Sequence, residues 1–178
     1  YGDPMVVGVQ TSENKKTATF NLRLVAQQKY DFVFWADCAT ETNNGTFSDL
    51  HYNTSDLTNI TVMGGYVGNN DEFDAFFFCK TDYTVTESFA ETSWVLRRPF
   101  GQLNVKTNDM TAIYDNTLKP TKVKVALTAL PTSFNAKTGT VGEQTANVEY
   151  EAEVINQANG ELTVDYIWAP VEEAALVN

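Results

Sequence analysis

The feature that most constrains this chain is a two-residue alternation of apolar and polar side chains, which returns in segment after segment. Thr17–Val25 is the clearest case, because Ala18, Phe20, Leu22 and Leu24 alternate with polar residues. Successive side chains of a β-strand point to opposite faces, so this pattern predicts a strand with one buried and one solvated face. Turn signals separate such segments at intervals of roughly 8–15 residues, which is typical of an antiparallel β-sandwich.

The other segments that alternate, or that form compact aromatic runs, are Tyr30–Ala36, Ile60–Met63, Phe73–Cys79, Thr81–Val85, Ser93–Val105, Val123–Leu127, Val148–Val154 and Leu162–Trp168. We expect the first two segments of the chain to form a hairpin, and Asn159-Gly160 to close a two-residue hairpin between the last two. Pro99 predicts an edge, a bulge or a change of sheet, since proline cannot donate to the sheet ladder. One short helix is expected at Asn108–Tyr114, and Pro120 stops any extension.

Composition supports β-structure and narrows the possible partners. The 178 residues include 23 Thr and 18 Val, residue types that fit a pleated, half-buried surface. The formal net charge of −11 argues against nucleic acid and against an anionic membrane surface, because both attract clustered basic side chains. We expect residues 1–178 to form a single domain, since this length is short for two.

Motifs that carry chemistry are few, and we expect neither an enzyme nor a cofactor. The sequence holds no phosphate-binding glycine motif and no recognisable pairing of nucleophile and base. One His and two Cys exclude multi-histidine and zinc-ribbon sites. Glu149, Glu151 and Glu153 alternate along one strand and are predicted to lie on its solvated face. The oxygen-rich stretch Asn69–Asp74 offers calcium ligands, but it lacks the spacing of a calcium-binding loop.

Cys38 and Cys79 are the two thiols of the chain, and each follows an aromatic-rich strand pattern. A disulfide between them would close a loop of about 40 residues and stabilise the fold by roughly 2–4 kcal/mol. The alternative is two separate buried thiols. Export of the protein would favour the disulfide, which makes this pair the candidate bridge.

Five segments share their order and spacing with one known family, and the match runs from about Ala18 to Val177. They are Tyr30–Asp37, Asp74–Phe76, Leu96–Val105, Asn108-Asp109 and Leu130–Asn135. Together they resemble the N-terminal domain of the Bacteroidetes fimbrillins, which are type V pilins. Phe73 departs from the pattern, because the family usually has arginine there.

The resemblance implies an all-β fold, a transthyretin-like antiparallel β-sandwich of the Greek-key type with one short helix. It also implies that the chain is the N-terminal part of a larger exported lipoprotein, with a C-terminal domain and an upstream lipoprotein signal outside this sequence. The expected place is then a cell-surface fimbria on the outer membrane of a Gram-negative bacterium. The expected partners are other pilin subunits, joined by donor-strand exchange as a homopolymer or a hetero-assembly.

Two functions remain open at this stage. The first is a structural or accessory fimbrial subunit that supports adhesion, as stalk, tip or anchor. The alternative is a surface-exposed lipoprotein that binds a host or bacterial glycan or protein through exposed loop aromatics. The candidate residues for that alternative are His51, Tyr52 and Tyr66.

Overall fold

The fold is described from a computed structural model, which covers residues 17–44, 47–86, 92–113 and 116–170. Within these ranges the chain is almost entirely β-structure, with two single-turn 3₁₀ helices. The elements are β1 (Lys29–Asp37), β2 (Ala39–Glu41), β3 (Phe47–Asp49), β4 (Tyr52–Asn53), β5 (Ile60–Val62), β6 (Ala75–Thr84), β7 (Phe100–Lys106), η1 (Met110–Ala112), η2 (Asn116–Leu118), β8 (Lys122–Pro131), β9 (Ser133–Asn135), β10 (Thr140–Val141), β11 (Thr145–Glu153) and β12 (Glu161–Trp168).

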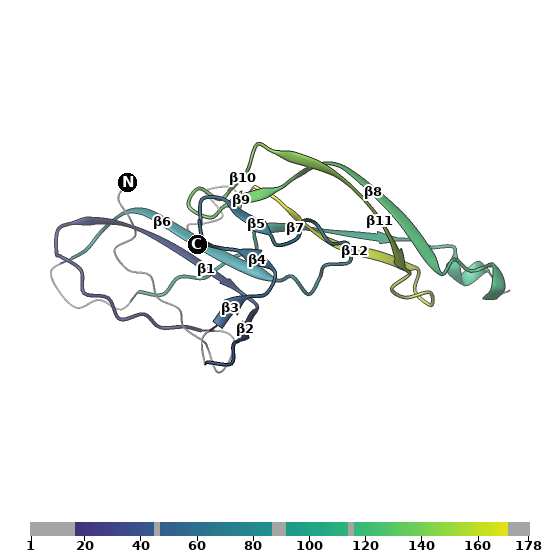
Figure 1. Ribbon diagram of the computed structural model, residues 1–178, viewed down its shortest axis with the longest axis horizontal. Coiled ribbons are helices and arrows are strands. Elements are labelled where there is room, and N and C mark those ends of the chain that lie inside the picture. The colour runs from purple at the N-terminus through teal and green to yellow at the C-terminus, as the bar shows by residue number, and fades with distance from the viewer. Residues whose placement is uncertain (1–16, 45–46, 87–91, 114–115, 171–178) are drawn as a thin grey trace.

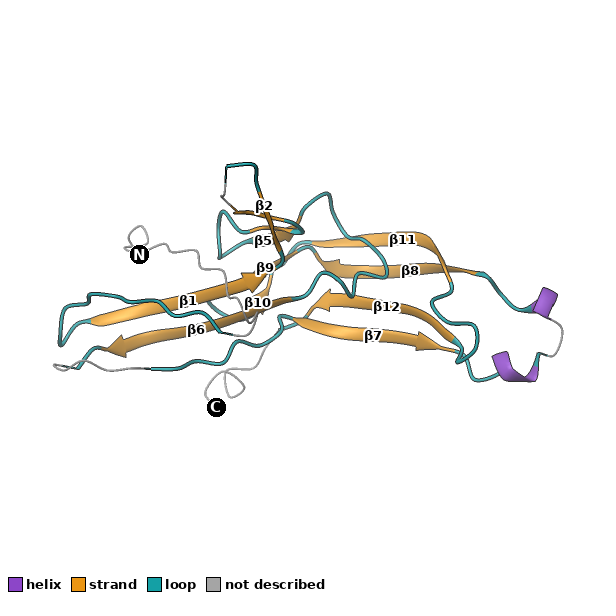
Figure 2. Ribbon diagram, turned by 90° about the horizontal axis from the view of Figure 1, so that it is seen from below, coloured by secondary structure: helices purple, strands orange, loops and turns teal. Residues whose placement is uncertain are grey.

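Three long two-stranded ribbons dominate the molecule, and every strand pair in them is antiparallel. They are β1–β6, β7–β12 and β8–β11. A small sheet of order β10-β9-β5-β4 lies where the ribbons meet, and β2–β3 forms a short hairpin beside it (Figure 1). The molecule is elongated, with β1–β6 at one end and the far turns of the other two ribbons at the opposite end (Figure 2). The expected antiparallel all-β class is therefore confirmed.

The partner of β1 differs from the expectation. Thr17–Val25 forms no strand, so the predicted hairpin with Tyr30–Ala36 is wrong. β1 pairs instead with β6, more than forty positions along the chain, with Val33 opposite Cys79. Period-two alternation shows which residues are extended, but it does not show which extended segment lies beside them.

Pro99 marks a change of sheet, as expected. Before it, Arg97 exchanges two backbone hydrogen bonds of 2.8 Å with Phe77 at the edge of β6. After it, the chain becomes β7 and pairs with β12. The Pro99 carbonyl accepts a hydrogen bond from the Ala169 amide, at the point where the second pairing begins.

Two local expectations are corrected at the far end of the molecule. The helix expected at Asn108–Tyr114 is only the 3₁₀ turn η1, preceded by Asp109 as N-cap. Asn159-Gly160 does not join two paired strands, because β11 pairs with β8 and β12 pairs with β7. The turn instead carries the chain from one ribbon to the other, with Gly160 at a φ of 72°.

The hydrophobic core lies where the ribbons meet and is built largely from aromatic side chains. Tyr52, Phe77 and Phe134 are almost wholly buried, and Trp168 packs against them. The Phe77 and Phe134 rings meet edge to face, with centroids 4.8 Å apart. Aromatic pairs in this arrangement contribute beyond their area burial, so this cluster is the principal stabilising contact among the described residues.

Candidate functional site

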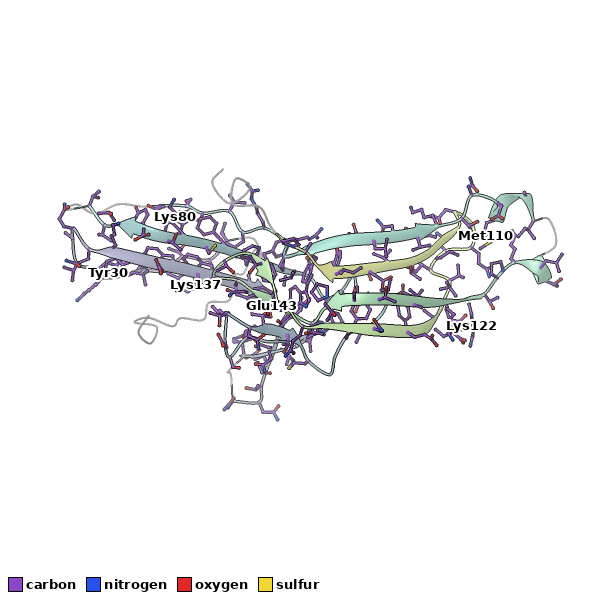
Figure 3. The ribbon with its side chains drawn as sticks, turned by 90° about the horizontal axis from the view of Figure 1, so that it is seen from above. Tyr30, Lys80, Met110, Lys122, Lys137 and Glu143 are labelled. Carbon is purple, nitrogen blue, oxygen red and sulfur yellow. The ribbon has the colours of Figure 1, made fainter. Side chains whose placement is uncertain are left out.

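The candidate site is the space between β8 and β12, whose central part is filled by side chains of the loop before β6 and of β11 and β12. The two strands lie side by side and point in the same direction (Figures 2 and 3). In the described part of the chain they belong to separate sheets, and no backbone hydrogen bond joins them. Each strand therefore has one edge paired within its own ribbon and one edge turned toward the gap. We call this feature the β8–β12 gap.

Strand phase shows which backbone groups of β8 face the gap. The Val154 amide donates to the Thr121 carbonyl at 2.9 Å, and these residues are directly opposite in the β8–β11 register. In an antiparallel pair, hydrogen-bonded and non-hydrogen-bonded residues alternate. Lys122, Lys124 and Ala126 therefore point their N–H and C=O groups away from β11 and into the gap.

The β12 edge is covered in its central part by two asparagine side chains. The Val164 amide donates to Asn69 Oδ1 at 3.2 Å. The Tyr166 amide donates to Asn70 Oδ1 at 2.6 Å, and Asn70 Nδ2 donates to the Tyr166 carbonyl at 3.2 Å. The same residues were weighed as calcium ligands, but here their amide oxygens accept hydrogen bonds from a strand edge.

A buried carboxyl group fixes this arrangement. Asp165 has no exposed surface. One of its oxygens accepts hydrogen bonds from the Tyr66 hydroxyl at 2.8 Å and from the Asn69 amide at 3.2 Å. The Tyr150 hydroxyl lies 2.7 Å from both oxygens. Since Tyr150 is on β11 and Asp165 on β12, this cluster links the two ribbons across the gap.

The two tyrosines are held in their neutral form. Burial raises the pKa of Tyr66, and the hydrogen bond to Asp165 raises it further. Burial also raises the pKa of Tyr150, again with Asp165 adding to the effect. A neutral phenol donates a hydrogen bond to the carboxyl group, whereas a phenolate beside it would repel a carboxylate.

Gly68 is required by the close approach of Tyr150. A Cβ atom placed on Gly68 would lie 2.3 Å from the Tyr150 ring. Asn69, the next residue, has a φ of 52°, in the left-handed region that asparagine tolerates better than most residues. The glycine-rich loop is therefore shaped so that its two asparagines reach β12.

The far end of the gap is a cavity of about 440 Å³ between the two ribbons. Its lining comes from β8, β12 and the loop between β7 and β8: Thr107, Asp109, Met110, Ile113, Pro120, Lys122, Val123, Lys124 and Leu162. Met110 and Lys122 mark this end in Figure 3. The hollow is open to solvent, and its lining combines apolar side chains such as Met110 and Leu162 with the charged residues Asp109, Lys122 and Lys124.

The opposite face of the β8–β11 ribbon is charged and solvated. Glu149, Glu151 and Glu153 are exposed there, as predicted. Lys124 Nζ lies 2.5 Å from a Glu149 oxygen, and Lys122 Nζ lies 3.0 Å from a Glu151 oxygen. These carboxylates neutralise neighbouring lysines and are not arranged as a catalytic pair.

The three candidate residues of the ligand-binding alternative make contacts within the protein. Tyr52 has 1% exposure, lies in the core and donates its hydroxyl to the Phe73 carbonyl, so it is not an exposed loop aromatic. The His51 ring stacks on Phe73 with centroids 3.8 Å apart. Tyr66 binds Asp165. Tyr52 and Tyr66 line one small pocket together, and His51 is not part of it.

No disulfide joins Cys38 and Cys79 in this structure. Cys38 is exposed and follows Asp37, which lies opposite Ala75. Cys79 is four positions farther along β6 and is buried in the core. At about 3.3 Å per residue along a strand, this separation exceeds the reach of a disulfide, so the candidate bridge is not formed here.

Metal and membrane features are also absent from the described ranges. No group of three or more His, Cys, Asp and Glu side chains is placed there to hold a metal ion. Within the oxygen-rich stretch Asn69–Asp74, which lacks the spacing of a calcium-binding loop, Asp74 binds Arg98 through two hydrogen bonds of 2.8 Å. Both helices described are single turns, and neither has the length or apolar character needed to cross a membrane.

Fold and site define an all-β protein made of antiparallel ribbons, in which Asn69 and Asn70 bond one strand edge and a buried tyrosine–aspartate cluster links two ribbons. Comparison with known families assigns residues 3–178 to a family of unknown function, DUF6562. The chain therefore belongs to this family. No curated protein and no solved structure matches the sequence significantly.

Sequence reasoning missed Asp165, Tyr150 and the two asparagines. Asp165 sits at an alternate position of a strand pattern, which normally indicates the solvated face. The sequence feature that could have indicated these residues is the glycine-rich segment Gly64–Asn70, which ends in two asparagines shortly before β6. Only the three-dimensional pairing shows that these asparagines face β12.

Proposed function

We propose that this protein is a structural or accessory subunit of cell-surface fimbriae that assembles by β-strand exchange, and that the β8–β12 gap is its strand acceptor. The observation that carries the proposal is that the neighbouring edges of β8 and β12 share no backbone hydrogen bond in the described ranges, although Asn69 and Asn70 bond the central part of the β12 edge. An edge with unused N–H and C=O groups is a template for another strand. Strand addition supplies main-chain hydrogen bonds for affinity and side-chain pockets for specificity.

The resemblance of five segments to fimbrillins supports the same proposal. It adds a transthyretin-like sandwich as the fold type, with export to the outer membrane of a Gram-negative bacterium as the location. The proposal requires no cofactor and no catalytic step. The alternative of a glycan-binding lipoprotein gains no support from His51, Tyr52 and Tyr66, since all three are engaged within the protein.

The decisive experiment places proline on the acceptor edge. Lys124→Pro removes an N–H that points into the gap, while the hydrogen bonds between β8 and β11 remain. Lys124→Ala is the matched control, because it loses the same side chain and keeps the N–H. Glu151→Pro is a second control, because Glu151 lies opposite Lys124 and turns its N–H to the far edge of the ribbon.

Filaments on the source cells are then scored by immunogold electron microscopy with an antibody against this chain. We expect gold on filaments in the wild type and in both controls, and loss of labelled filaments in Lys124→Pro. Circular dichroism of the purified variants checks that each one folds. Gold on a smooth cell surface in the wild type, with filaments unlabelled or absent, would contradict the fimbrial proposal.

A further inference from the structure

The turn at Asn159-Gly160 is a feature that the proposed function does not use. It joins β11 to β12 and so connects two ribbons of the molecule. Asn159 is exposed, and Gly160 has a φ of 72°. Asparagine followed by glycine is the pair that loses its side-chain amide most readily, because glycine has no Cβ to hinder attack by its nitrogen. The conformation of the turn decides whether the folded protein permits this reaction.

The Asn159 side chain folds forward over the next peptide. Its Oδ1 accepts a hydrogen bond from the Glu161 amide, two residues along the chain, at 3.1 Å. This arrangement is an Asx turn. The amide carbon of Asn159 is therefore held beside the peptide that contains the Gly160 nitrogen, the atom that has to attack it. Among the described residues, no hydrogen bond occupies the Gly160 N–H.

The same hydrogen bond favours the reaction electrostatically. When the Gly160 nitrogen adds to the amide carbon, negative charge develops on Asn159 Oδ1. The Glu161 N–H already points at that oxygen, as the donors of an oxyanion hole do. Asn156 holds the turn in place, because its Oδ1 accepts hydrogen bonds from the Ala158 amide at 2.9 Å and the Asn159 amide at 3.4 Å. The donor is therefore in position before the reaction begins.

We propose that Asn159 is a site of spontaneous deamidation in the folded protein. This inference does not depend on the proposed function. The Gly160 nitrogen loses its proton to water and forms a bond to Asn159 Cγ. The bond between Cγ and the side-chain nitrogen then breaks, and that nitrogen takes up a proton and leaves as ammonia. Water opens the resulting cyclic imide at either carbonyl, which gives aspartate or isoaspartate.

Isoaspartate changes the contact between this turn and the end of β7. There the Thr107 amide donates to the Gly160 carbonyl at 2.8 Å. The two residues pack so closely that a Cβ atom on Gly160 would overlap the Thr107 carbonyl oxygen. Isoaspartate lengthens the main chain by a methylene group just before Gly160, so this contact cannot be kept unchanged. Both products also add a negative charge next to Glu161.

Incubation of the full-length protein at mildly alkaline pH, followed by cleavage after glutamate, tests the site. Such cleavage releases the peptide 154–161, whose asparagines are Asn156 and Asn159. Fragmentation in the mass spectrometer shows which of them has become aspartate, and chromatography separates the isoaspartyl form. We expect conversion at Asn159 and not at Asn156, which is followed by glutamine. An unmodified Asn159 would overturn the inference.

Asn159→Gln is the control for the peptide, because its longer side chain forms a cyclic imide less readily. It should leave the peptide unmodified. Unfolding in urea then separates a reaction that the turn promotes from one that the sequence alone permits. Asn44-Gly45, the other Asn-Gly pair of the sequence, is followed in the same samples as the reference. Relative to that reference, we expect Asn159 to react at least as fast in the folded protein as in urea. A faster reaction in urea would show that the fold protects Asn159 and would contradict the proposal.

Two variants test the part played by the Glu161 N–H. Glu161→Pro removes this donor and should slow conversion by about tenfold, the factor that corresponds to roughly one lost hydrogen bond. Glu161→Ala is the matched control, because it loses the same side chain and keeps the N–H. Equal rates in the two variants would refute the role of this donor. The urea comparison needs no variant, so it remains decisive if Glu161→Pro does not fold.

Hydrogen exchange tests the consequence for β7. Exchange of the Thr107 amide should be faster in the isoaspartyl protein than in the unconverted one, because its bond to the Gly160 carbonyl is disturbed. Asn159→Asp is the control, since it has the added charge and an ordinary main chain, and it should leave the exchange nearly unchanged. Equal exchange in the isoaspartyl and unconverted proteins would contradict this consequence.

Discussion

The β1–β6 ribbon and the β8–β12 gap differ in which groups cover their strand edges and faces. On the β1–β6 ribbon, Trp94 covers the face turned away from the core, with ring centroids 5.1 Å from Phe32 and 5.5 Å from Phe78. The β6 edge receives the backbone of Arg97. At the gap, by contrast, side-chain amides cover one part of an edge and a cavity borders the rest.

The same element, a two-stranded ribbon, is therefore covered in different ways at the two ends of the molecule. Two-stranded ribbons are marginal unless something packs on them. Aromatic rings and a neighbouring segment of the same chain supply that packing for β1–β6. The other two ribbons are tied to each other mainly by the buried cluster around Asp165. The predictions below test how far this contrast goes.

The largest effect is expected in the aromatic core. Phe77→Ala removes a ring with no exposed surface and should lower the free energy of unfolding by about 3–5 kcal/mol. Leu118→Ala, at a side chain that is 71% exposed near the far end, should change it by less than about 0.5 kcal/mol. Urea denaturation measures both. Similar losses for the two variants would remove the contrast between the packed centre and the open end.

A smaller loss is expected at the cluster that links the ribbons. Asp165→Asn keeps the shape but places an amide group against donors that need an acceptor, so we expect a loss of about 1–3 kcal/mol. Hydrogen exchange of the Val164 and Tyr166 amides should rise, because a neutral amide oxygen accepts a weaker hydrogen bond from the Asn69 amide than a carboxylate oxygen does. Asp74→Asn, at a partly exposed ion pair, is the control. Unchanged exchange in Asp165→Asn would show that Asn69 and Asn70 hold the β12 edge without help from Asp165.

The tyrosine cluster also predicts a dependence on pH. Both phenols have a pKa raised in the folded protein, so the unfolded chain loses these protons first. Stability contributed by the neutral phenols is present below about pH 10, the ordinary tyrosine pKa, and falls as the pH rises above it. Tyr66→Phe and Tyr150→Phe should each flatten this fall in alkaline urea titrations. If the stability of both variants fell with pH as steeply as that of the wild type, the assignment of this pH dependence to Tyr66 and Tyr150 would be contradicted.

The smallest effect is expected on the charged outer face. Lys124→Ala removes an exposed ion pair with Glu149 and should cost no more than about 0.5 kcal/mol. Added salt should shrink even that difference, since exposed charges are screened. A loss above about 1 kcal/mol would show that this face carries more of the ribbon's stability than exposed ion pairs usually do. It would also weaken Lys124→Ala as a control for assembly.

Much of the strand content could be predicted from the sequence, because alternation depends on local geometry. The runs Tyr30–Ala36, Val148–Val154 and Leu162–Trp168 fall on β1, β11 and β12 with small shifts at their ends. Pairing could not be predicted in the same way. The predicted hairpins joined neighbours in sequence, whereas β1 and β6 meet across a long connection that sequence periodicity does not specify.

The site could not be predicted, because its key residues do not follow the alternation of buried apolar and exposed polar side chains from which the strands are predicted. Thr163 and Asp165 occupy the polar positions of an alternating strand, yet both are wholly buried. They lie beneath the other ribbon, and Tyr150 on that ribbon bonds to Asp165. These polar side chains are buried because a second ribbon packs over them. The sequence pattern of a single strand does not reveal such a ribbon.

The shared direction of β8 and β12 sets the polarity of whatever fills the gap. A strand between two strands that point the same way is antiparallel to both or parallel to both. If it is antiparallel, β7, β12, the inserted strand, β8 and β11 alternate in direction from one side to the other. Two separate ribbons then become one continuous antiparallel sheet, the arrangement that is commoner in proteins. In the proposed assembly the middle strand of that sheet would come from another molecule, so unfolding one subunit would loosen the sheet of its neighbour.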